Sequence, residues 1–276
     1  MERVGIISDV HGNITALNAV LNDMKEKNVK HIFCLGDSVA KGANPDKVID
    51  VLKSNCEVML IGNTDYGICN PNVKDKGYWS RNKIGEERAD YIYNLPKMHE
   101  FYLSGYLIRL FHASPYNLDG IFNPMFSNKE NSYKNLEIYN PEVLFHNTEF
   151  IGKSPNDKVP DIVGYGHIHT PLIVKFKNKT IFNTGSVGIP TEMLNMDPQD
   201  ITNKFSSLAS YTILEGNYGS EDFAPISITQ VRLPYDIDKE IEFVKNSDMP
   251  NKRNIILCLK TAMSEKNIFG SNVFYE

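Results

Sequence analysis

The first 65 residues alternate short apolar runs with amphipathic segments, and each apolar run ends in a polar turn. The runs are residues 3–8 (RVGIIS), 31–37 (HIFCLGD) and 56–65 (CEVMLIGNTD). Between the first two, apolar residues recur at spacings of three and four from Ile14 to Met24, which predicts a helix with Asn13 as its N-cap. Before the third run, Asn44-Pro45 marks a second helix start. This alternation predicts parallel strands joined by crossover helices, an α/β sheet.

The rest of the chain is richer in β signals. We expect a helix over 85–96, a hairpin over 100–115 that turns at Gly105, and a short helix within 140–154. Strands are expected within 161–176, 179–188, 210–216 and 225–233, and these late strands are expected to form a second sheet. Residues 1–276 are predicted to form one domain, with a variable helical and loop insertion around 66–160 and a C-terminal helix from about 236.

Composition limits the cellular setting. A net charge of -5 and a pI near 5.8 argue against binding a nucleic-acid polymer, which favours a basic surface. The four cysteines form no CxxC motif, and buried core thiols in a reducing cytoplasm are expected. No run of 18 apolar residues and no signal-peptide pattern is present. We therefore expect a cytoplasmic protein that binds no membrane; its oligomeric state is left open.

Polar side chains stand where the predicted strands end. They are Asp9 and His11 (DxH), Asp37 (GD), Asn63 (GN), His112, and His167 with His169 (GHxH). Ligands gather beyond the carboxyl ends of parallel strands, so these residues are candidates for one site. Oxygen and imidazole ligands suit divalent Mn, Fe, Zn or Ni. A metal pair needs a bridging carboxylate, for which Asp37 is the natural candidate. Alternation along a strand would point His167 and His169 the same way.

Each motif alone is common, but their joint order is specific. The series D-x-H, G-D, G-N, H and G-H-x-H, from Asp9 to His169, resembles the calcineurin-like metallophosphoesterase superfamily. The nearest likeness is to its small bacterial and archaeal phosphodiesterase-like members. The resemblance implies an α/β (α+β) fold, a β-sandwich of two mixed sheets flanked by helices, with a dinuclear metal centre at the strand ends.

Carried over position by position, the resemblance implies two divalent metal ions. The implied ligands of the first ion are Asp9, His11 and His169. Those of the second are Asn63, His112 and His167, with Asp37 as the bridge. A metal-bound hydroxide would attack the phosphorus of a small phosphodiester or phosphomonoester. Asp37, Asn63 and His112 would be catalytic through the metals.

Further positions match family positions near the substrate phosphate. Asn13 is one, although it also suits a simple helix cap, and the ligand Asn63 is another. Residues 182–188 (FNTGSVG) resemble the family's Asn-x-Gly-Ser turn, which would place Gly185 and Ser186 beside the centre.

The residue after Asn63 departs from the pattern of the family's protein phosphatases and nucleases. Those enzymes have a histidine there that protonates the leaving oxygen, whereas this chain has Thr64. Losing such an acid typically costs 10²–10⁴-fold in rate. Asp65, His146 or a water molecule are candidates to replace it. Thr64 therefore points to small esters with good leaving groups.

Two alternatives stay open. One is a Ser/Thr protein phosphatase-like enzyme, which Thr64 disfavours. The other is a catalytically weak binding scaffold of the same fold, which the full set of expected ligands disfavours.

Overall fold

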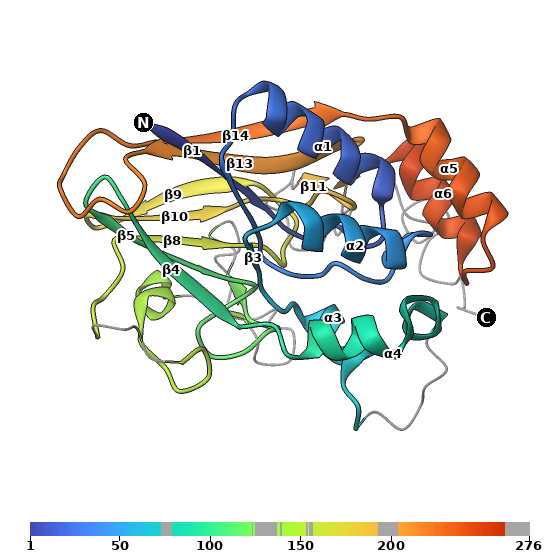
Figure 1. Cartoon of the computed structure of the whole chain (residues 1–276), viewed down its shortest axis with the longest axis horizontal. Coiled ribbons are helices and arrows are strands. Elements are labelled where there is room, and N and C mark those ends of the chain that lie inside the picture. The colour runs from blue at the N-terminus through green and yellow to red at the C-terminus, as the bar shows by residue number, and fades with distance from the viewer. Residues whose placement is uncertain are drawn as a thin grey trace.

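The computed structural model describes residues 1–72, 79–122, 124, 137–138, 140–152, 154, 157–192 and 204–262 of the chain. Two five-stranded mixed sheets lie at its centre, and helices cover them (Figure 1). The predicted sandwich of two mixed sheets flanked by helices is confirmed. That residues 1–276 form one domain stays a prediction.

The first sheet joins the start of the chain to its late strands. Its order is β14 (Ser227–Pro234), β13 (Leu208–Gly216), β1 (Glu2–Ile7), β2 (His31–Cys34) and β3 (Val58–Met59). β1, β2 and β3 pair in parallel, whereas β13 pairs antiparallel with both β1 and β14. In the β1–β13 register, Val4 lies opposite Leu214.

The order of the second sheet is β4 (Met98–Leu103), β5 (Tyr106–Phe111), β8 (Ile162–Tyr165), β10 (Lys179–Asn183) and β9 (Leu172–Phe176). It has its parallel strands β5, β8 and β10 at the centre and an antiparallel strand at each edge. β4 and β5 form the predicted hairpin, in which Ser104 and Gly105 both have positive φ. Two short ribbons pair β6 (Ile121–Phe122) with β7 (Glu137–Ile138) and β11 (Thr191–Glu192) with β12 (Lys204–Phe205).

The helices lie outside the sheets. They are α1 (Ile14–Glu26), α2 (Pro45–Asn55), α3 (Asn63–Cys69), α4 (Trp79–Tyr93), the 3-10 helix η2 (Pro141–Phe145), α5 (Ile237–Asn246) and α6 (Lys252–Thr261). The Asn13 side chain caps α1 by accepting from the Ala16 amide, as predicted. α5 begins after its N-cap Asp236, where the C-terminal helix was expected.

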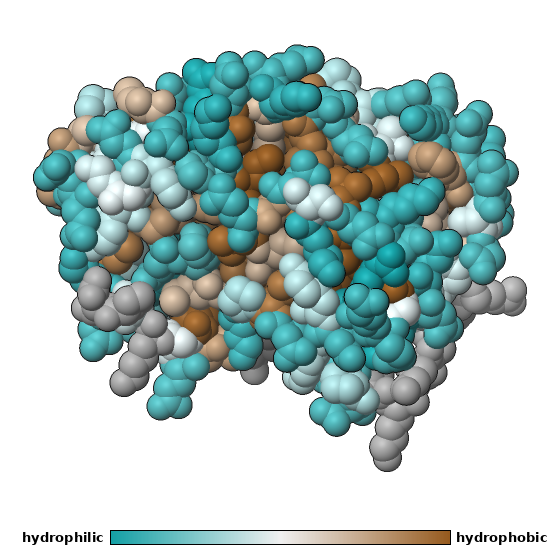
Figure 2. All heavy atoms as spheres, in the orientation of Figure 1, coloured by the Kyte–Doolittle hydropathy of each residue, from teal (hydrophilic) through white to brown (hydrophobic). Residues whose placement is uncertain are grey.

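Apolar side chains of both sheets meet between them. Ile6 and Phe33 of the first sheet share one buried cluster with Ile108 and Phe182 of the second. On the other face of the first sheet, α1 and α2 enclose a second cluster, which includes Leu17. Figure 2 shows apolar atoms gathered toward the middle of this face, between hydrophilic outer surfaces. Each fully buried side chain of this kind stabilises the fold by about 1.5–3 kcal/mol, which fixes the strand ends in space.

Two expectations about the strands were wrong. Of the late strands, β8, β9 and β10 lie in the second sheet as expected, but β13 and β14 extend the first sheet, because β13 pairs with β1 far away in sequence. The third apolar run forms only the two-residue strand β3, and residues 60–62 continue as a loop toward α3. A second C-terminal helix, α6, was not predicted.

Candidate metal centre

The polar residues at the strand ends lie in loops with unusual backbone angles. Five of them have positive φ: Asp9 (55°), His11 (48°), Asp37 (54°), His167 (64°) and His169 (61°). Residues other than glycine rarely adopt this left-handed region, and such strain concentrates at functional sites. Here it turns the chain sharply after each strand.

Hydrogen bonds between the loops hold these turns together. The Asp9 amide donates to the Gly36 carbonyl (2.9 Å), and the His11 amide donates to the Asp37 carbonyl (2.9 Å). The Gly166 amide donates to the His112 carbonyl across the second sheet (2.8 Å). The loops from both sheets are therefore placed by the backbone itself.

Close approach explains two of the glycines that precede candidate ligands. A Cβ atom at Gly62 would collide with the Asp37 carboxylate, and one at Gly166 would collide with Ser8 and Asp9. Neither glycine has a positive φ, so backbone conformation does not require glycine there. The space is needed by the neighbouring carboxylates instead.

One group of side chains gathers at the end of β1. The Nε2 atoms of His11 and His169 are 3.2 Å apart, and His169 Nε2 is 3.1 Å from Asp9 Oδ1. These three side chains are close enough to hold one metal ion. All three come from the set predicted for the first ion.

A second group lies beside it. The Asn63 Oδ1 atom is 3.0 Å from His112 Nε2 and 3.1 Å from His167 Nδ1. Asp37 lies between the groups: its Oδ2 is 3.5 Å from His11 Nε2, and its Oδ1 is 3.6 Å from His112 Nε2. The structure thus brings all seven predicted residues together, with Asp37 where a bridging carboxylate would stand.

The outer nitrogen of three imidazoles faces a backbone carbonyl. His11 Nδ1 lies 3.1 Å from the Val39 carbonyl oxygen, His112 Nδ1 lies 3.0 Å from that of Leu35, and His169 Nδ1 lies 2.9 Å from that of Ile189. A carbonyl oxygen only accepts, so each Nδ1 carries the proton. In the neutral ring, Nε2 then points a lone pair into the site.

The positions of these lone pairs show whether the site suits a cation. Two unprotonated Nε2 atoms at 3.2 Å cannot hydrogen-bond to each other. Nearby, Asp9 Oδ1 is buried and accepts no hydrogen bond. Facing lone pairs of this kind are stabilised by a shared divalent cation, so the residues fit the metals that the sequence suggested.

The protonation states agree with this assignment. Burial lowers the pKa of His11 to about 3 and that of His167 to about 4, so both rings are neutral near pH 7. Burial raises the pKa of Asp37, but His112 and the hydrogen bond from Thr64 lower it, and the net pKa lies below the usual value. Metal ligands must be deprotonated, as His11, His167 and Asp37 are. Burial lowers the pKa of His112, whereas the Asp37 and Asp9 carboxylates raise it more, so that its net pKa lies above the usual value.

Thr64 contacts the bridging position. Its hydroxyl donates to Asp37 Oδ2 (2.6 Å), and its amide donates to Asp37 Oδ1 (2.9 Å). The residue that replaces the family's histidine therefore orients the central carboxylate. No local sequence pattern predicts this contact, which links the start of α3 to the loop after β2.

His167 and His169 point in different directions. Strand β8 ends at Tyr165, so both histidines lie in the following loop and strand alternation does not apply. His167 faces Asn63, whereas His169 faces His11. The expectation that both imidazoles share one direction was wrong.

The candidate replacement acids are engaged in hydrogen bonds. Asp65 is buried and accepts from the Ser38, Val39 and Gly62 amides. His146 hydrogen-bonds through Nδ1 to the exposed Tyr116 hydroxyl (2.6 Å).

The expected phosphate contacts have structural partners. Asn13 caps α1, and its Nδ2 donates to the Gly188 carbonyl and the Tyr235 hydroxyl (3.2 Å each). Ser186 is buried and donates to the Asp9 carbonyl (2.7 Å), next to Gly185 with φ 75°. Both side chains brace the loops around the site, and their contact with substrate stays a prediction.

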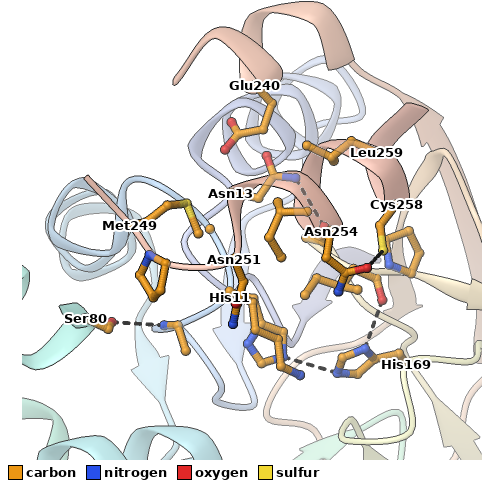
Figure 3. Close-up of a pocket in the computed structure, with 18 of the residues that line it drawn as sticks. His11, Asn13, Ser80, His169, Glu240, Met249, Asn251, Asn254, Cys258 and Leu259 are labelled. Atoms are coloured by element: carbon orange, nitrogen blue, oxygen red, sulfur yellow. Dashed lines mark hydrogen bonds between the residues drawn. The ribbon is translucent and has the colours of Figure 1, made fainter. Parts of the chain in front are cut away.

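A cavity of about 460 Å³ extends from the first ligand group toward the C-terminal helices α5 and α6 (Figure 3). His11 and His169 line one end, and Met249, Ile255 and Leu259 line the other. Sequence reasoning missed these C-terminal residues. Asn251 as N-cap and the apolar spacing of Ile255 and Leu259 were the signals that predict α6.

A two-sheet sandwich with paired ligand groups at its strand ends defines a metallophosphoesterase fold. The model of the calcineurin-like phosphoesterase superfamily domain matches residues 2–201. The chain is 31% identical over 263 residues to an uncharacterized protein of Methanocaldococcus jannaschii, covering 90% of this chain and 93% of that protein. The chain therefore belongs to the calcineurin-like phosphoesterase superfamily, as predicted.

Solved structures share the fold. A metallophosphoesterase from Sphaerobacter thermophilus matches with a TM-score of 0.64 and 23% identity, covering 95% of this chain and 99% of that one. A hypothetical protein from Pyrococcus horikoshii OT3 matches with a TM-score of 0.68 and 17% identity, covering 96% and 100%. Within the described ranges, no helix has the length and apolar character needed to span a membrane.

Proposed function

We propose that this phosphoesterase hydrolyses a small phosphodiester or phosphomonoester at a centre of two divalent metal ions. The observation that carries the proposal is the pair of ligand groups that share Asp37. Asp9, His11 and His169 would hold one ion, and Asn63, His112 and His167 would hold the other. Two such ions supply an activated water molecule and neutralise the charge on the phosphoryl oxygens. Mn, Fe, Zn and Ni all suit these ligands.

The chain's own residues set the geometry. The Asp37 carboxylate faces both groups, and Thr64 fixes it with two hydrogen bonds. Carbonyl oxygens hold the outer nitrogens of three imidazoles, which keeps their inner nitrogens directed at the ions.

Proton donation limits the substrate. No histidine follows Asn63, and the Thr64 hydroxyl is engaged by Asp37. Asp65 is engaged by the Ser38, Val39 and Gly62 amides, and His146 by the Tyr116 hydroxyl. The proposed enzyme therefore favours leaving groups that need little protonation. This disfavours a Ser/Thr protein phosphatase, whose alkoxide leaving group needs an acid, and the complete ligand set disfavours a metal-free scaffold.

We also propose a cytoplasmic setting and a small substrate. All four cysteines are free in the structure, which fits a reducing cytoplasm. The net charge of -5 favours a small ester over a nucleic-acid polymer as the substrate.

Asp37→Asn tests the proposal. We expect turnover of p-nitrophenyl phosphate and bis(p-nitrophenyl) phosphate in the presence of Mn²⁺, and a loss of about 10²–10³-fold or more in kcat in the variant. Asp90→Asn makes the same chemical change on the exposed surface of α4 and should keep full activity. Failure of the wild-type protein to turn over either ester with any of Mn²⁺, Fe²⁺, Zn²⁺ or Ni²⁺ would overturn the proposal.

A further inference from the structure

The cavity beside the metal centre is closed by the C-terminal helices. Its volume of about 460 Å³ lies within the range of about 300–1,000 Å³ that is usual for small-molecule sites. Figure 3 shows His11 and His169 at one end and Glu240, Met249 and Leu259 at the other. A phosphate ester bound at the ligand groups would extend its organic part into this space.

The wall formed by α6 is apolar and remains open to the cavity. Ile255, Cys258 and Leu259 recur at spacings of three and four, so they share one face of the helix, and all three line the cavity. No residue of α6 is buried. Ile68 and Pro190 add further apolar surface to the lining of the cavity. Such walls bind apolar surface and offer little to a charged or strongly hydrated group.

Ring side chains add flat, fixed surfaces. Trp79 lines the cavity, and its indole N–H donates to Asp248 (2.8 Å), which holds the ring in place. Tyr235 also lines it, and its hydroxyl accepts from Asn13 (3.2 Å). Rigid aromatic walls favour planar ligands, because stacking needs a matching flat face.

Polar groups occur at a few places in this apolar lining. Asn251 and Asn254 of the α6 region present amides to the cavity, and amides pair with the polar edges of ring systems. Lys41 is exposed beside His11, where its charge acts on the imidazole. An ammonium group at this place suits a phosphoryl oxygen of the ester. The cavity thus has a charged end that suits the phosphate of a ligand and a largely apolar end that suits its organic group.

We propose that this cavity is the specificity pocket of the enzyme and that it selects phosphate esters that carry a planar, ring-bearing organic group of about nucleoside size. This inference rests on the proposed phosphoesterase function and names its substrate class. α6 supplies the selecting wall, and the ligand groups at the other end hold the phosphate.

Two substrates with one leaving group test the selection. Thymidine 5′-(p-nitrophenyl phosphate) and methyl p-nitrophenyl phosphate both release p-nitrophenolate, so they differ only in the group that would occupy the pocket. We expect kcat/KM with Mn²⁺ to be at least roughly 10-fold higher for the thymidine ester, since apolar contacts of this size discriminate by about 10–200-fold.

A filled pocket should remove the preference. Ile255→Trp places a large ring in the cavity and should lower kcat/KM for the thymidine ester roughly 10-fold while changing the methyl ester less than about 2-fold. Leu257→Trp is the matched control, because Leu257 lies on the same helix but does not line the cavity. It should leave both substrates unchanged.

Binding separates failure of this inference from failure of catalysis. Titration calorimetry with Mn²⁺ present should show tighter binding of thymidine 5′-monophosphate than of methyl phosphate, and Ile255→Trp should abolish the difference. Equal affinities in the wild-type protein, or equal kcat/KM values for the two esters, would overturn the pocket assignment. An absence of turnover together with selective binding would overturn the proposed function alone and support the pocket.

Discussion

The two ends of the cavity are built in different ways. At one end, His11 and His169 are held by left-handed loops, backbone hydrogen bonds and the parallel strands behind them. At the other end, Ile255 and Leu259 lie on a helix with no buried residue. The first end is fixed by the core of the sandwich, and the second is added by the last described helices. Chemistry and selection therefore depend on separate parts of the chain.

The largest effect is expected at the fixed end. His11→Asn removes an inner ligand, and loss of an outer hydrogen-bond partner alone typically costs 10–100-fold in metal affinity or activity. We expect a fall of at least about 100-fold in kcat, together with reduced bound metal measured by mass spectrometry of the purified protein. The half-buried His31 hydrogen-bonds to Glu2 and Glu57 and is none of the seven candidate ligands, so His31→Asn is the control. Equal metal content in wild type and His11→Asn would contradict the ligand assignment.

Thr64→Val should have a smaller effect at the same end. Valine removes the hydroxyl that orients Asp37, which we expect to cost about 10–100-fold in metal affinity or kcat, whereas Thr64→Ser should retain most activity. Thr64 acts here as a positioning residue. The deficit should therefore be equal for p-nitrophenyl and alkyl esters; a deficit that grows with poorer leaving groups would instead show that Thr64 donates the proton.

Asn13 lines the cavity together with residues of both ends. Its variants test which of its hydrogen bonds stabilises the fold there. Asn13→Ala removes the cap of α1 and should lower the free energy of unfolding by about 1 kcal/mol in urea titrations. Asn13→Asp keeps an acceptor for the Ala16 amide but loses the donation to Gly188 and Tyr235. If both variants unfold at the same urea concentration, the cap is not the stabilising contact.

The smallest effect is expected at the helical end. Burial raises the pKa of Glu240, although hydrogen bonds from Thr15 oppose the shift. A carboxyl whose pKa is raised by folding binds its proton more tightly in the folded state, so its contribution to stability falls as the pH rises past the usual value of about 4.3.

Glu240→Gln removes this penalty. The free energy of unfolding of the variant, minus that of the wild type, should increase from about pH 4.5 to about pH 7.5. Urea titrations at both pH values measure this difference. Glu242→Gln, on the exposed side of the same helix, should show no such gain. A loss of stability at pH 7.5 would mean that the charged carboxylate is preferred.

The metal end of the cavity could be predicted from the sequence to a greater extent than the contacts between distant segments. Asp9, Asp37 and Asn63 could be foreseen together, because local patterns place each at a strand end and parallel strands bring those ends to one edge. The pairing of β13 with β1 could not, because antiparallel contacts across some 200 residues leave no local pattern. The contact of Thr64 with Asp37 depends on side-chain direction in a loop, which spacing does not encode.

The ligand loops come from both sheets, with Asp37 and Asn63 beyond strands of the first and His112 and His167 beyond strands of the second. An ion bound to them would act as a cross-link between the two halves of the sandwich. Since the unfolded chain has no such site, the bound ion would add RT ln(1 + [L]/Kd) to the free energy of unfolding, about 2.7 kcal/mol at 100 times Kd. Metal supply would then set the thermal tolerance of the protein as well as its rate, and a chelator would weaken both together.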